Sequence, residues 1–154
     1  MKAQIRVKMF LLLIVISILV SCATNQSFVM PNKDFRQYKT AYVEKISPDQ
    51  FNLGPAIVYE LGDMGFRVVS KPAPINPSST DMKVRYSYTT GWDLSKYLHS
   101  FQIVFLDAQT DAIIANIAYR LKGAWVGSDA RITDAFNEFR KKLGFPESKR
   151  SAVQ

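Results

Sequence analysis

The N-terminal segment restricts most strongly what the rest of this chain can form. Lys2, Arg6 and Lys8 precede an apolar run at residues 9–20, which only Ser17 interrupts. About 12 residues at 1.5 Å each extend ~18 Å as a helix, well short of the ~30 Å hydrocarbon core of a bilayer. A basic start followed by a short apolar run is typical of a signal peptide that is later removed. We therefore expect the folded domain to lie after this run.

The apolar run ends at Leu19-Val20-Ser21-Cys22, which contains the only cysteine of the chain. This tetrapeptide resembles the lipobox of bacterial lipoproteins. In that family the cysteine thiol receives a diacylglyceryl group, the peptide is cut just before it, and the new amine is usually acylated, as with palmitate. The resemblance implies a signal peptide at residues 1–21, with Cys22 as the lipid-attachment site. The alternative, a signal anchor with an unrelated cysteine, fits the short run less well.

The residue after the cysteine indicates a location by the same resemblance. In many Gram-negative systems an Asp there retains lipoproteins in the inner membrane, and this chain has Ala23. The resemblance therefore implies an outer-membrane lipoprotein whose domain faces the periplasm. Since lipidation would use the lone thiol, we expect no disulfide, and the domain must fold on its hydrophobic core alone.

The charge of the chain gives little support to nucleic-acid binding. The formal net charge of +7 includes three cations before the apolar run, so 17 basic and 13 acidic residues leave +4 after removal of the signal peptide. The only dense basic cluster is 140–142, at the end of a predicted helix, where cations favour the helix dipole. A nucleic-acid surface would need a basic face with interleaved aromatic residues.

Hydrophobic periodicity predicts one domain over residues 36–146. Residues 22–35 are polar and lack periodicity, so we expect a lipidated N-terminus and tether, and we expect a charged, disordered tail at 147–154. The predicted elements are strands at 39–46, 66–70, 82–89, 98–106 and 112–121, and helices at 49–64 and 128–143.

The order of these elements is β-α-β-β-β-β-α. Two amphipathic helices cannot bury their apolar stripes alone, and a largely antiparallel sheet offers one face to both. The predicted fold is therefore an α+β two-layer sandwich, with about five strands and two helices on one face of the sheet.

Several short motifs over this region resemble an uncharacterised, domain-of-unknown-function type of small bacterial lipoprotein. They are the strand after Tyr38-Lys39, the Gly65–Val69 and Asp81–Val84 segments, the Asp107–Ile113 hairpin and the Phe145-Pro146 ending. This chain departs from the pattern in the returning strand of the hairpin, where Ile114 or Ala115 replaces an aromatic residue. The resemblance implies an envelope lipoprotein with no known enzymatic activity, and it offers no active site.

The sequence contains no set of residues that predicts catalysis or a cofactor. His99 is the only histidine, so a His/Cys metal site is not expected. A catalytic triad would need His99 as its base with Ser95 or Ser100, and the Gly-x-Ser-x-Gly motif is absent. Asp107 and Asp111 flank a predicted hairpin and are more typical of turn residues than of a carboxylate site. We expect no enzyme activity, no metal and no cofactor.

Four residues are candidate contacts for a partner or ligand: Trp92, Trp125, Tyr97 and Arg85. Both tryptophans lie in glycine-flanked segments predicted as loops, and tryptophan is enriched at interface hot spots. The alternative is that each tryptophan folds over an end of the core.

The second face of the predicted sheet raises a related question. Val104, Leu106 and Ile114 would leave apolar groups on that face, beside the polar residues Lys83, Arg85 and Asn116. Either Phe28 and Phe35 of the N-terminal segment cover these groups, or a partner does.

Two functions follow as hypotheses. The first is a non-catalytic accessory or assembly lipoprotein that binds another envelope protein. The second is a carrier or sensor of a small amphiphile or a cell-wall glycan, with Trp92, Trp125 and Tyr97 lining the site. An enzyme that uses His99 is the weakest of the three possibilities.

The lipobox assignment makes a direct prediction for Cys22→Ser. We expect this variant to be neither lipidated nor normally processed, because the thiolate is the nucleophile and a hydroxyl is far weaker. The measurement is incorporation of radiolabelled palmitate in growing cells. Label retained by the serine variant would contradict the assignment.

Overall fold

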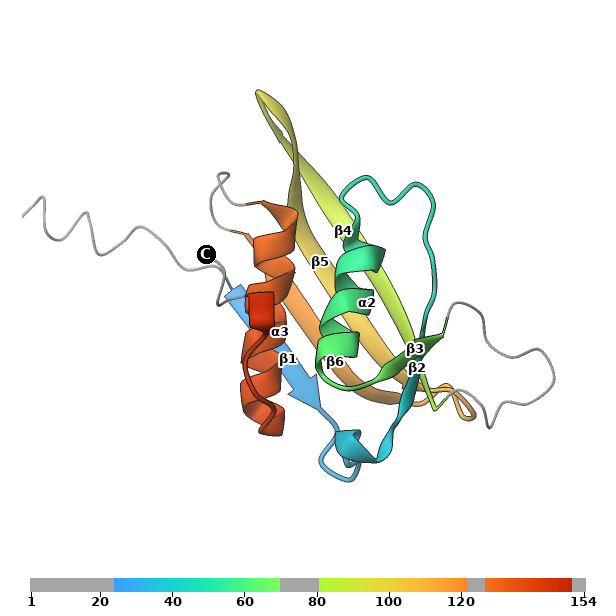
Figure 1. Cartoon of the computed structure of the whole chain (residues 1–154). Coiled ribbons are helices and arrows are strands. Elements are labelled where there is room, and N and C mark those ends of the chain that lie inside the picture. The colour runs from blue at the N-terminus through green and yellow to red at the C-terminus, as the bar shows by residue number, and fades with distance from the viewer. Residues whose placement is uncertain (1–23, 70–80, 122–126, 151–154) are drawn as a thin grey trace, which may run out of the picture.

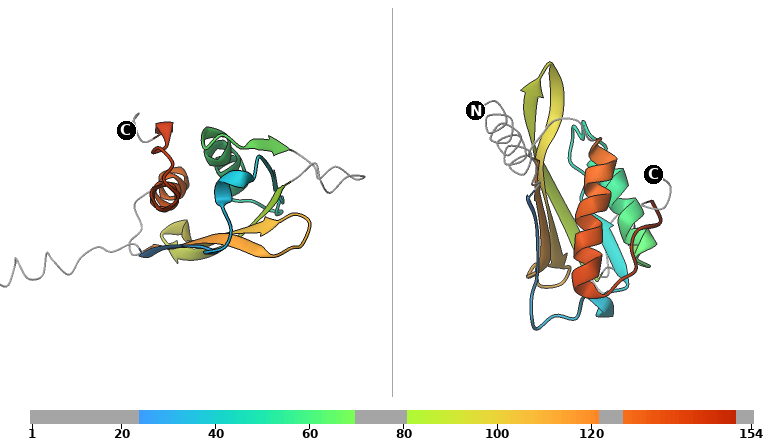
Figure 2. Two further views of the ribbon diagram at one scale, coloured as in Figure 1. Left: turned by 90° about the horizontal axis from the view of Figure 1, so that it is seen from below. Right: turned by 90° about the vertical axis from the view of Figure 1, so that its left-hand side faces the viewer.

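A six-stranded sheet with two helices on one face forms the structure (Figures 1 and 2). The computed structural model describes residues 24–69, 81–121 and 127–150. The elements, in chain order, are β1 (Thr24–Val29), η1 (Phe35–Gln37), β2 (Thr40–Val43), α2 (Leu53–Asp63), β3 (Arg67–Val69), β4 (Met82–Asp93), β5 (Ser95–Asp107), β6 (Ile113–Arg120) and α3 (Ser128–Leu143).

The sheet is mixed, with the strand order β1-β6-β5-β4-β2-β3. The pairs β1–β6, β6–β5 and β5–β4 are antiparallel, whereas β2 is parallel to both β3 and β4. Helix α2 connects β2 to its parallel neighbour β3, and α3 follows β6 and packs beside α2 (Figure 1). The predicted α+β class and the placing of both helices on one face are confirmed.

The predicted tether at residues 22–35 is wrong for most of its length. Thr24–Val29 form β1, which pairs along its whole length with β6 at the edge of the sheet. Its polar side chains are compatible with an edge strand because backbone pairing, rather than burial, holds it. Two further bonds fix it to α3: the Asn25 side-chain amide donates to the Asp134 carbonyl at 3.5 Å, and the Lys142 ammonium donates to the Ser27 carbonyl at 2.5 Å.

The two ends of the domain also differ from the predicted boundaries. Phe35, placed in the tether by the sequence, is buried in the core. At the other end, Ser148 lies in the predicted disordered tail but is buried, and its backbone N–H donates to the Asn137 side chain at 2.9 Å. The folded unit therefore includes both positions, and residues 151–154 lie outside the described residues.

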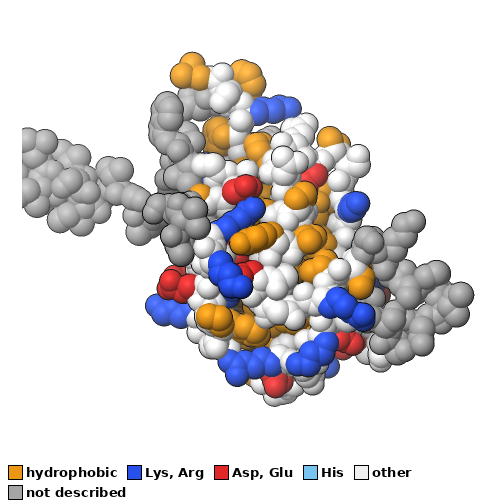
Figure 3. Space-filling view, in the orientation of Figure 1, with side chains coloured by type: hydrophobic (Ala, Val, Ile, Leu, Met, Phe, Trp, Pro, Cys, Tyr) orange, Lys and Arg blue, Asp and Glu red, His pale blue; other side chains and the backbone are white. Residues whose placement is uncertain are grey.

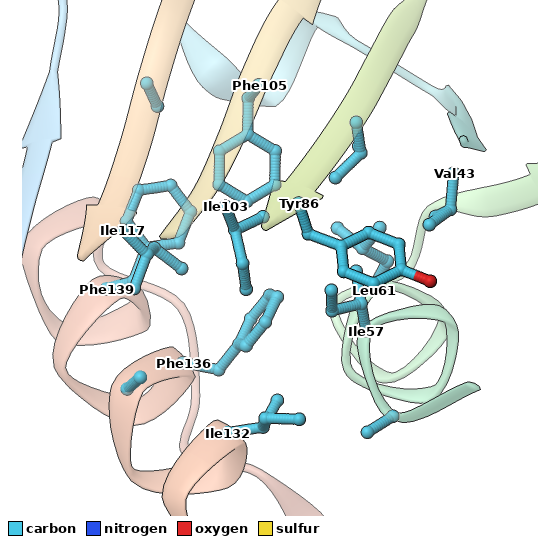
Figure 4. Packing of buried hydrophobic residues seen from close by; sticks show 14 of the residues in the cluster. Val43, Ile57, Leu61, Tyr86, Ile103, Phe105, Ile117, Ile132, Phe136 and Phe139 are labelled. Carbon is cyan, nitrogen blue, oxygen red and sulfur yellow. The ribbon is translucent and has the colours of Figure 1, made fainter. Parts of the chain in front are cut away.

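The core lies between the sheet and the two helices (Figure 4). Phe35 is part of this core, with its ring 5.2–5.4 Å from those of Phe66, Phe105 and Phe139 in edge-to-face arrangements, which aromatic pairs favour. The predicted apolar stripes of both helices are confirmed: the buried members are Leu53, Ala56, Ile57, Leu61 and Met64 near α2, and Ile132, Ala135, Phe136 and Phe139 in α3.

A buried ion cluster joins α2 to α3. The Arg140 side chain is fully buried, and its Nη2 lies 2.9 Å from Glu60 Oε2 and 3.0 Å from Asp63 Oδ2. Glu60 Oε1 also accepts from the Thr133 hydroxyl at 3.0 Å and from the Ser148 hydroxyl at 3.2 Å. The cluster therefore connects both helices and the C-terminal segment.

The basic cluster 140–142 lies in the last turn of α3, as predicted, but Arg140 has a second role that the sequence did not indicate. The α3 helix does end at Gly144, which has a left-handed φ of 69°, and Lys141 and Lys142 do occupy its last turn. Arg140, however, lies on the same helix face as Phe136, and this face points at α2. A charge on this face must be paired, and the acidic residues of α2 pair it.

Removing the Arg140 charge should therefore destabilise the protein strongly. We expect Arg140→Met to lower the free energy of unfolding by about 3–5 kcal/mol, since it leaves the fully buried Glu60 carboxylate without its cation, whereas Asp63 keeps Lys149 at 3.5 Å. The matched control is Lys141→Met, an exposed position one residue along, which should change it by less than ~0.5 kcal/mol. Equal urea midpoints for the two variants would contradict this role for the cluster.

Candidate functional site: the uncovered sheet face and the hairpin end

The sheet face opposite the helices carries a band of polar side chains. Strand alternation and register place two rows across it from β1 to β4. The first row is Gln26, Ala118, Gln102 and Ser87, and the second is Phe28, Asn116, Val104 and Arg85. Among the described residues both helices lie on the other side of the sheet (Figure 2).

A shallow hollow of about 640 Å³ lies on this face. Most of the side chains around it are hydroxyls and amides, and the Thr89 and Ser100 hydroxyls lie 2.6 Å apart across β4 and β5. The outward-facing residues around the hollow are Thr24, Gln26, Ser87, Thr89, Ser100, Gln102, Ala118 and Arg120. Such a surface both donates and accepts hydrogen bonds, and so suits a polar protein surface or a saccharide.

The two cations that β4 carries on this face each form an ion pair. Arg85 Nε donates to Glu44 Oε2 at 2.8 Å, and Lys83 Nζ lies 2.5 Å from Asp111 Oδ1. The hydrogen bond from Lys83 holds the pKa of Asp111 below its ordinary value, and the bond to Glu44 raises the pKa of Arg85. Because both pairs are partly exposed, each contributes little to stability. Arg85 thus presents a neutralised pair to a partner rather than a free positive charge.

The predicted apolar patch on this face is smaller than expected. A β-bulge between Phe105 and Leu106 shifts the alternation, and Ile114 consequently belongs to the core. Val104 is half-buried and Leu106 is buried. Phe28 lies on the same face and is half-exposed, whereas Phe35 packs in the core and covers nothing here.

The β4–β5 hairpin runs past the end of the other strands. The row Thr89–Ser100 is the last that continues into β6, and residues 90–93 pair only with 95–98. The loop predicted around Trp92 is therefore wrong: residues 91–93 belong to β4, and the apex is Leu94, with a φ of 58°. Gly91 permits this ribbon, because a Cβ at position 91 would overlap the Tyr97 ring across the strand pair.

The four sequence-predicted contact residues separate into two places. Trp92 is 74% exposed near the hairpin apex, so the alternative that it folds over the core is wrong. Tyr97 lies on the same hairpin and is half-buried, with its ring against Gly91. Arg85 lies seven residues along β4 from Trp92, roughly 23 Å away at 3.3 Å per residue. Trp125 lies outside the described residues.

The hairpin apex gathers exposed hydrophobic side chains (Figure 3). Besides Trp92, Leu94 is 91% exposed, and sequence analysis did not single it out. Its position beside Asp93 and Ser95 suggested an ordinary polar turn. The signal that could have found it is an aliphatic residue where a hairpin turn favours Gly, Asn or Asp.

A second hollow, of about 520 Å³, lies beside the start of α2. Its apolar lining residues are Val43, Ile46, Pro55, Val58, Val68 and Val69. At its polar end the Tyr86 hydroxyl donates to Asp49 Oδ2 at 3.0 Å, and burial raises the pKa of Tyr86 to about 12. Asp49 in turn accepts from the Leu53 and Gly54 backbone N–H groups at the start of α2. This is the apolar cavity that a small amphiphile would fit, away from the predicted aromatic residues.

The residues considered for catalysis are not brought together. The ring of His99 lies 6.2 Å from that of Tyr97, Ser100 pairs with Thr89, and Ser95 is exposed near the hairpin apex. Within residues 24–69, 81–121 and 127–150, no group of three or more His, Cys, Asp or Glu side chains could hold a metal ion. In the same residues no helix is long and apolar enough to cross a bilayer.

Asp107 is a turn residue, as the sequence predicted. Its Oδ1 accepts from the backbone N–H groups of Gln109 and Thr110 at 3.1 and 3.0 Å. Burial alone would raise the pKa of Asp107, but these hydrogen bonds outweigh it and hold that pKa below its ordinary value.

Comparison with known proteins identifies the fold. No protein-family model matches the sequence, and no curated protein does. The structure is similar to a DUF4136 family protein from Bacteroides thetaiotaomicron, at 11% identity over 81% of this chain and 97% of that one, with a TM-score of 0.52. It is also similar to the PelC dodecamer from Paraburkholderia phytofirmans, at 16% identity over 81% and 100% of the two chains, with a TM-score of 0.55.

A third similar structure is a PDZ domain protein from Parabacteroides distasonis, at 13% identity over 82% of this chain and 37% of that one, with a TM-score of 0.51. At these identities the similarity shows a shared fold. The sequence-based resemblance to a domain-of-unknown-function type of α+β domain is thus supported at the level of the fold.

The exposure of Trp92 makes a stability prediction. Trp92→Ala should change the free energy of unfolding by less than ~1 kcal/mol, because the side chain contributes little to the folded core. Phe136→Ala is the contrasting variant, and emptying that fully buried site should cost about 3–5 kcal/mol. Urea melts of the two variants beside the parent give both values. If Trp92→Ala lowered the free energy of unfolding as much as Phe136→Ala, the alternative that Trp92 folds over an end of the core would be correct.

Proposed function

We propose that this chain is a non-catalytic lipoprotein of the cell envelope that binds another envelope protein through its uncovered sheet face. In this proposal acyl chains on Cys22 hold it in the outer membrane with the domain in the periplasm, and it acts there as an accessory or assembly factor. The observation that carries the proposal is the polar face with its hollow, which among the described residues no helix covers.

The position of β1 supports membrane attachment through Cys22. Thr24 begins β1 and pairs with Arg120, so only Ala23 separates the strand from the lipobox cysteine. Two extended residues span at most ~7 Å. An acyl group on Cys22 would therefore hold the sheet close to the bilayer surface.

The chemistry of the face favours a polar protein partner. Its amide and hydroxyl groups can pair with backbone and side-chain groups of another protein, and two of its cations, Lys83 and Arg85, already have acidic partners, which leaves Arg120 at the edge of the hollow. A nucleic acid would instead need unpaired basic groups along its backbone. The proposal takes the protein as non-catalytic on the sequence, in which His99 is the only histidine and the Gly-x-Ser-x-Gly motif is absent.

A second copy of the same chain is the competing partner. The structurally similar PelC is a dodecamer, which shows that this fold can present a surface to copies of itself. A test of the proposal must therefore distinguish a foreign partner from self-association.

Photo-crosslinking in intact cells makes this distinction. A photoreactive amino acid replaces Gln102, which is exposed in the centre of the uncovered face, and the matched control replaces Glu138, which is exposed on α3. We expect position 102 to give an adduct that contains a different envelope protein, and position 138 to give none. Adducts only with the same chain, or equal patterns at both positions, would overturn the proposal.

The apolar cavity beside α2 favours a second candidate function, the carriage of a small amphiphile. Val58 lines this cavity and is 40% exposed, so Val58→Trp should fill it with little effect on folding. Native mass spectrometry of the purified parent should then show a bound lipid-like mass that the variant lacks. Parent protein that carries no bound mass would contradict this role of the cavity.

A further inference from the structure

The β4–β5 hairpin ends in an unusual pair of side chains. Trp92 and Leu94 are the two most exposed large hydrophobic residues among the described ones. They lie where the β4–β5 hairpin extends past the end of β6 as a two-stranded ribbon. This is the part of the sheet that projects furthest (Figure 1). An apolar tip on a projecting ribbon marks a contact surface rather than a folding requirement.

The backbone at the apex supports the same conclusion independently. Leu94 adopts a left-handed conformation, with a φ of 58°. Gly and Asn adopt this conformation readily, whereas other L-residues do so at a conformational cost. Folding alone would therefore favour Gly or Asn at position 94, and the leucine side chain, 91% exposed, gains nothing from burial in the monomer. Its hydrophobicity must act outside the monomer.

The tip lies at the end of the sheet where the N-terminal segment enters. Thr24 pairs with Arg120, which pairs with Ser100, which pairs with Thr89 at the foot of the ribbon. From this row Leu94 lies five residues further along β4, about 17 Å at 3.3 Å per residue. Cys22 lies at most ~7 Å from Thr24. The tip thus reaches at least about 10 Å beyond the proposed lipid-attachment point, which is enough for the depth of ~5–10 Å at which interfacial segments bury.

We propose that the β4–β5 hairpin tip inserts Trp92 and Leu94 into the lipid surface beside the N-terminal anchor. The inference rests on the proposed membrane attachment at this end of the domain. It assigns the tip to lipid, whereas the uncovered sheet face remains for the protein partner.

The composition of the tip suits this occupant. Indole groups favour the boundary between headgroups and acyl chains, and leucine favours the acyl side. Lys96 pairs across the ribbon with Trp92 and is exposed, so its long side chain can reach the headgroup phosphates. With Asp93 and Lys96 the tip has no formal net charge. Insertion therefore requires apolar contact and not an anionic surface.

The base of the hairpin is fixed to the body of the protein. Leu98 is buried, and its carbonyl accepts a hydrogen bond from Nη1 of the buried Arg131 of α3. The Tyr97 ring packs against Gly91 on the opposite strand. These contacts hold the ribbon in one direction relative to the helices, so an inserted tip would also fix the orientation of the domain on the membrane.

Depth-dependent quenching tests the proposal. The full chain with Trp125→Phe, which leaves Trp92 as the only tryptophan, is reconstituted into phosphatidylcholine vesicles that contain lipids with brominated acyl chains. We expect Trp92 emission to fall about twofold or more and to shift to shorter wavelength, as for an interfacial indole. The matched control moves the only tryptophan to Gln109, an exposed position on the β5–β6 hairpin at the other end of these strands, where brominated lipid should have no effect.

Two further variants separate lipid contact from a structural role. Leu94→Asn accommodates the left-handed turn, so its urea midpoint should equal or exceed that of the parent, while Trp92 quenching should fall at least about twofold. Ile113→Asn removes a half-exposed apolar side chain at the far end of the sheet and should leave the quenching unchanged.

The outcomes that overturn the proposal are distinct from those that overturn membrane anchoring. The inference would be overturned if Trp92 emission were not quenched in protein that floats with the vesicles, or if quenching were equal in the parent and in Leu94→Asn. A wavelength shift without quenching would also overturn it, because that result indicates a protein contact. Palmitate labelling reports Cys22 acylation separately. Quenching is scored only in protein that floats with the vesicles, so it tests the tip whether or not Cys22 is acylated.

Discussion

The buried Arg140 cluster is the interaction on which the arrangement of the helices depends. The side chains of Glu60 in α2 and Arg140 in α3 are fully buried, so separating them would leave a charge in the core without its partner. The ion cluster therefore adds a directional constraint to the apolar packing around it. Ser148 completes the hydrogen bonding of Glu60, and therefore the C-terminal segment belongs to the same unit.

The sequence predicted the fold where hydrophobic periodicity decides the structure. The spacing of Leu53, Ile57 and Leu61, and of Ile132, Phe136 and Phe139, placed both helices on one face of the sheet. The prediction failed where backbone hydrogen bonds or a charged side chain are paired with residues that are distant in the sequence. β1 is polar because pairing with β6 holds it, and Arg140 is buried because α2 supplies its carboxylates. Neither partner can be identified from the local pattern.

The sequence predicted only part of the candidate site, because the other features depend on backbone conformation and strand pairing. Trp92 was recognised as a contact residue from its type and its flanking glycine, and its exposure agrees with that hypothesis. Leu94 was missed because its neighbours have turn composition, and its left-handed backbone becomes evident only in the structure. Ile114 was assigned to the wrong face because a single bulge inverts the alternation that the sequence assumes. The distance along β4 between Arg85 and the hairpin end is likewise evident only from the length of that strand in the structure.

The absence of a spacer between β1 and the lipobox limits the volume that the domain could search. A lipoprotein with a flexible linker of tens of residues samples a radius of several nanometres, which grows with the square root of linker length. Here Ala23 alone lies between Cys22 and the first paired residue of the sheet. With the lipid on Cys22, the domain could rotate in the plane of the bilayer but could not extend across the periplasm. In that arrangement a partner of the domain would itself have to come to the membrane surface.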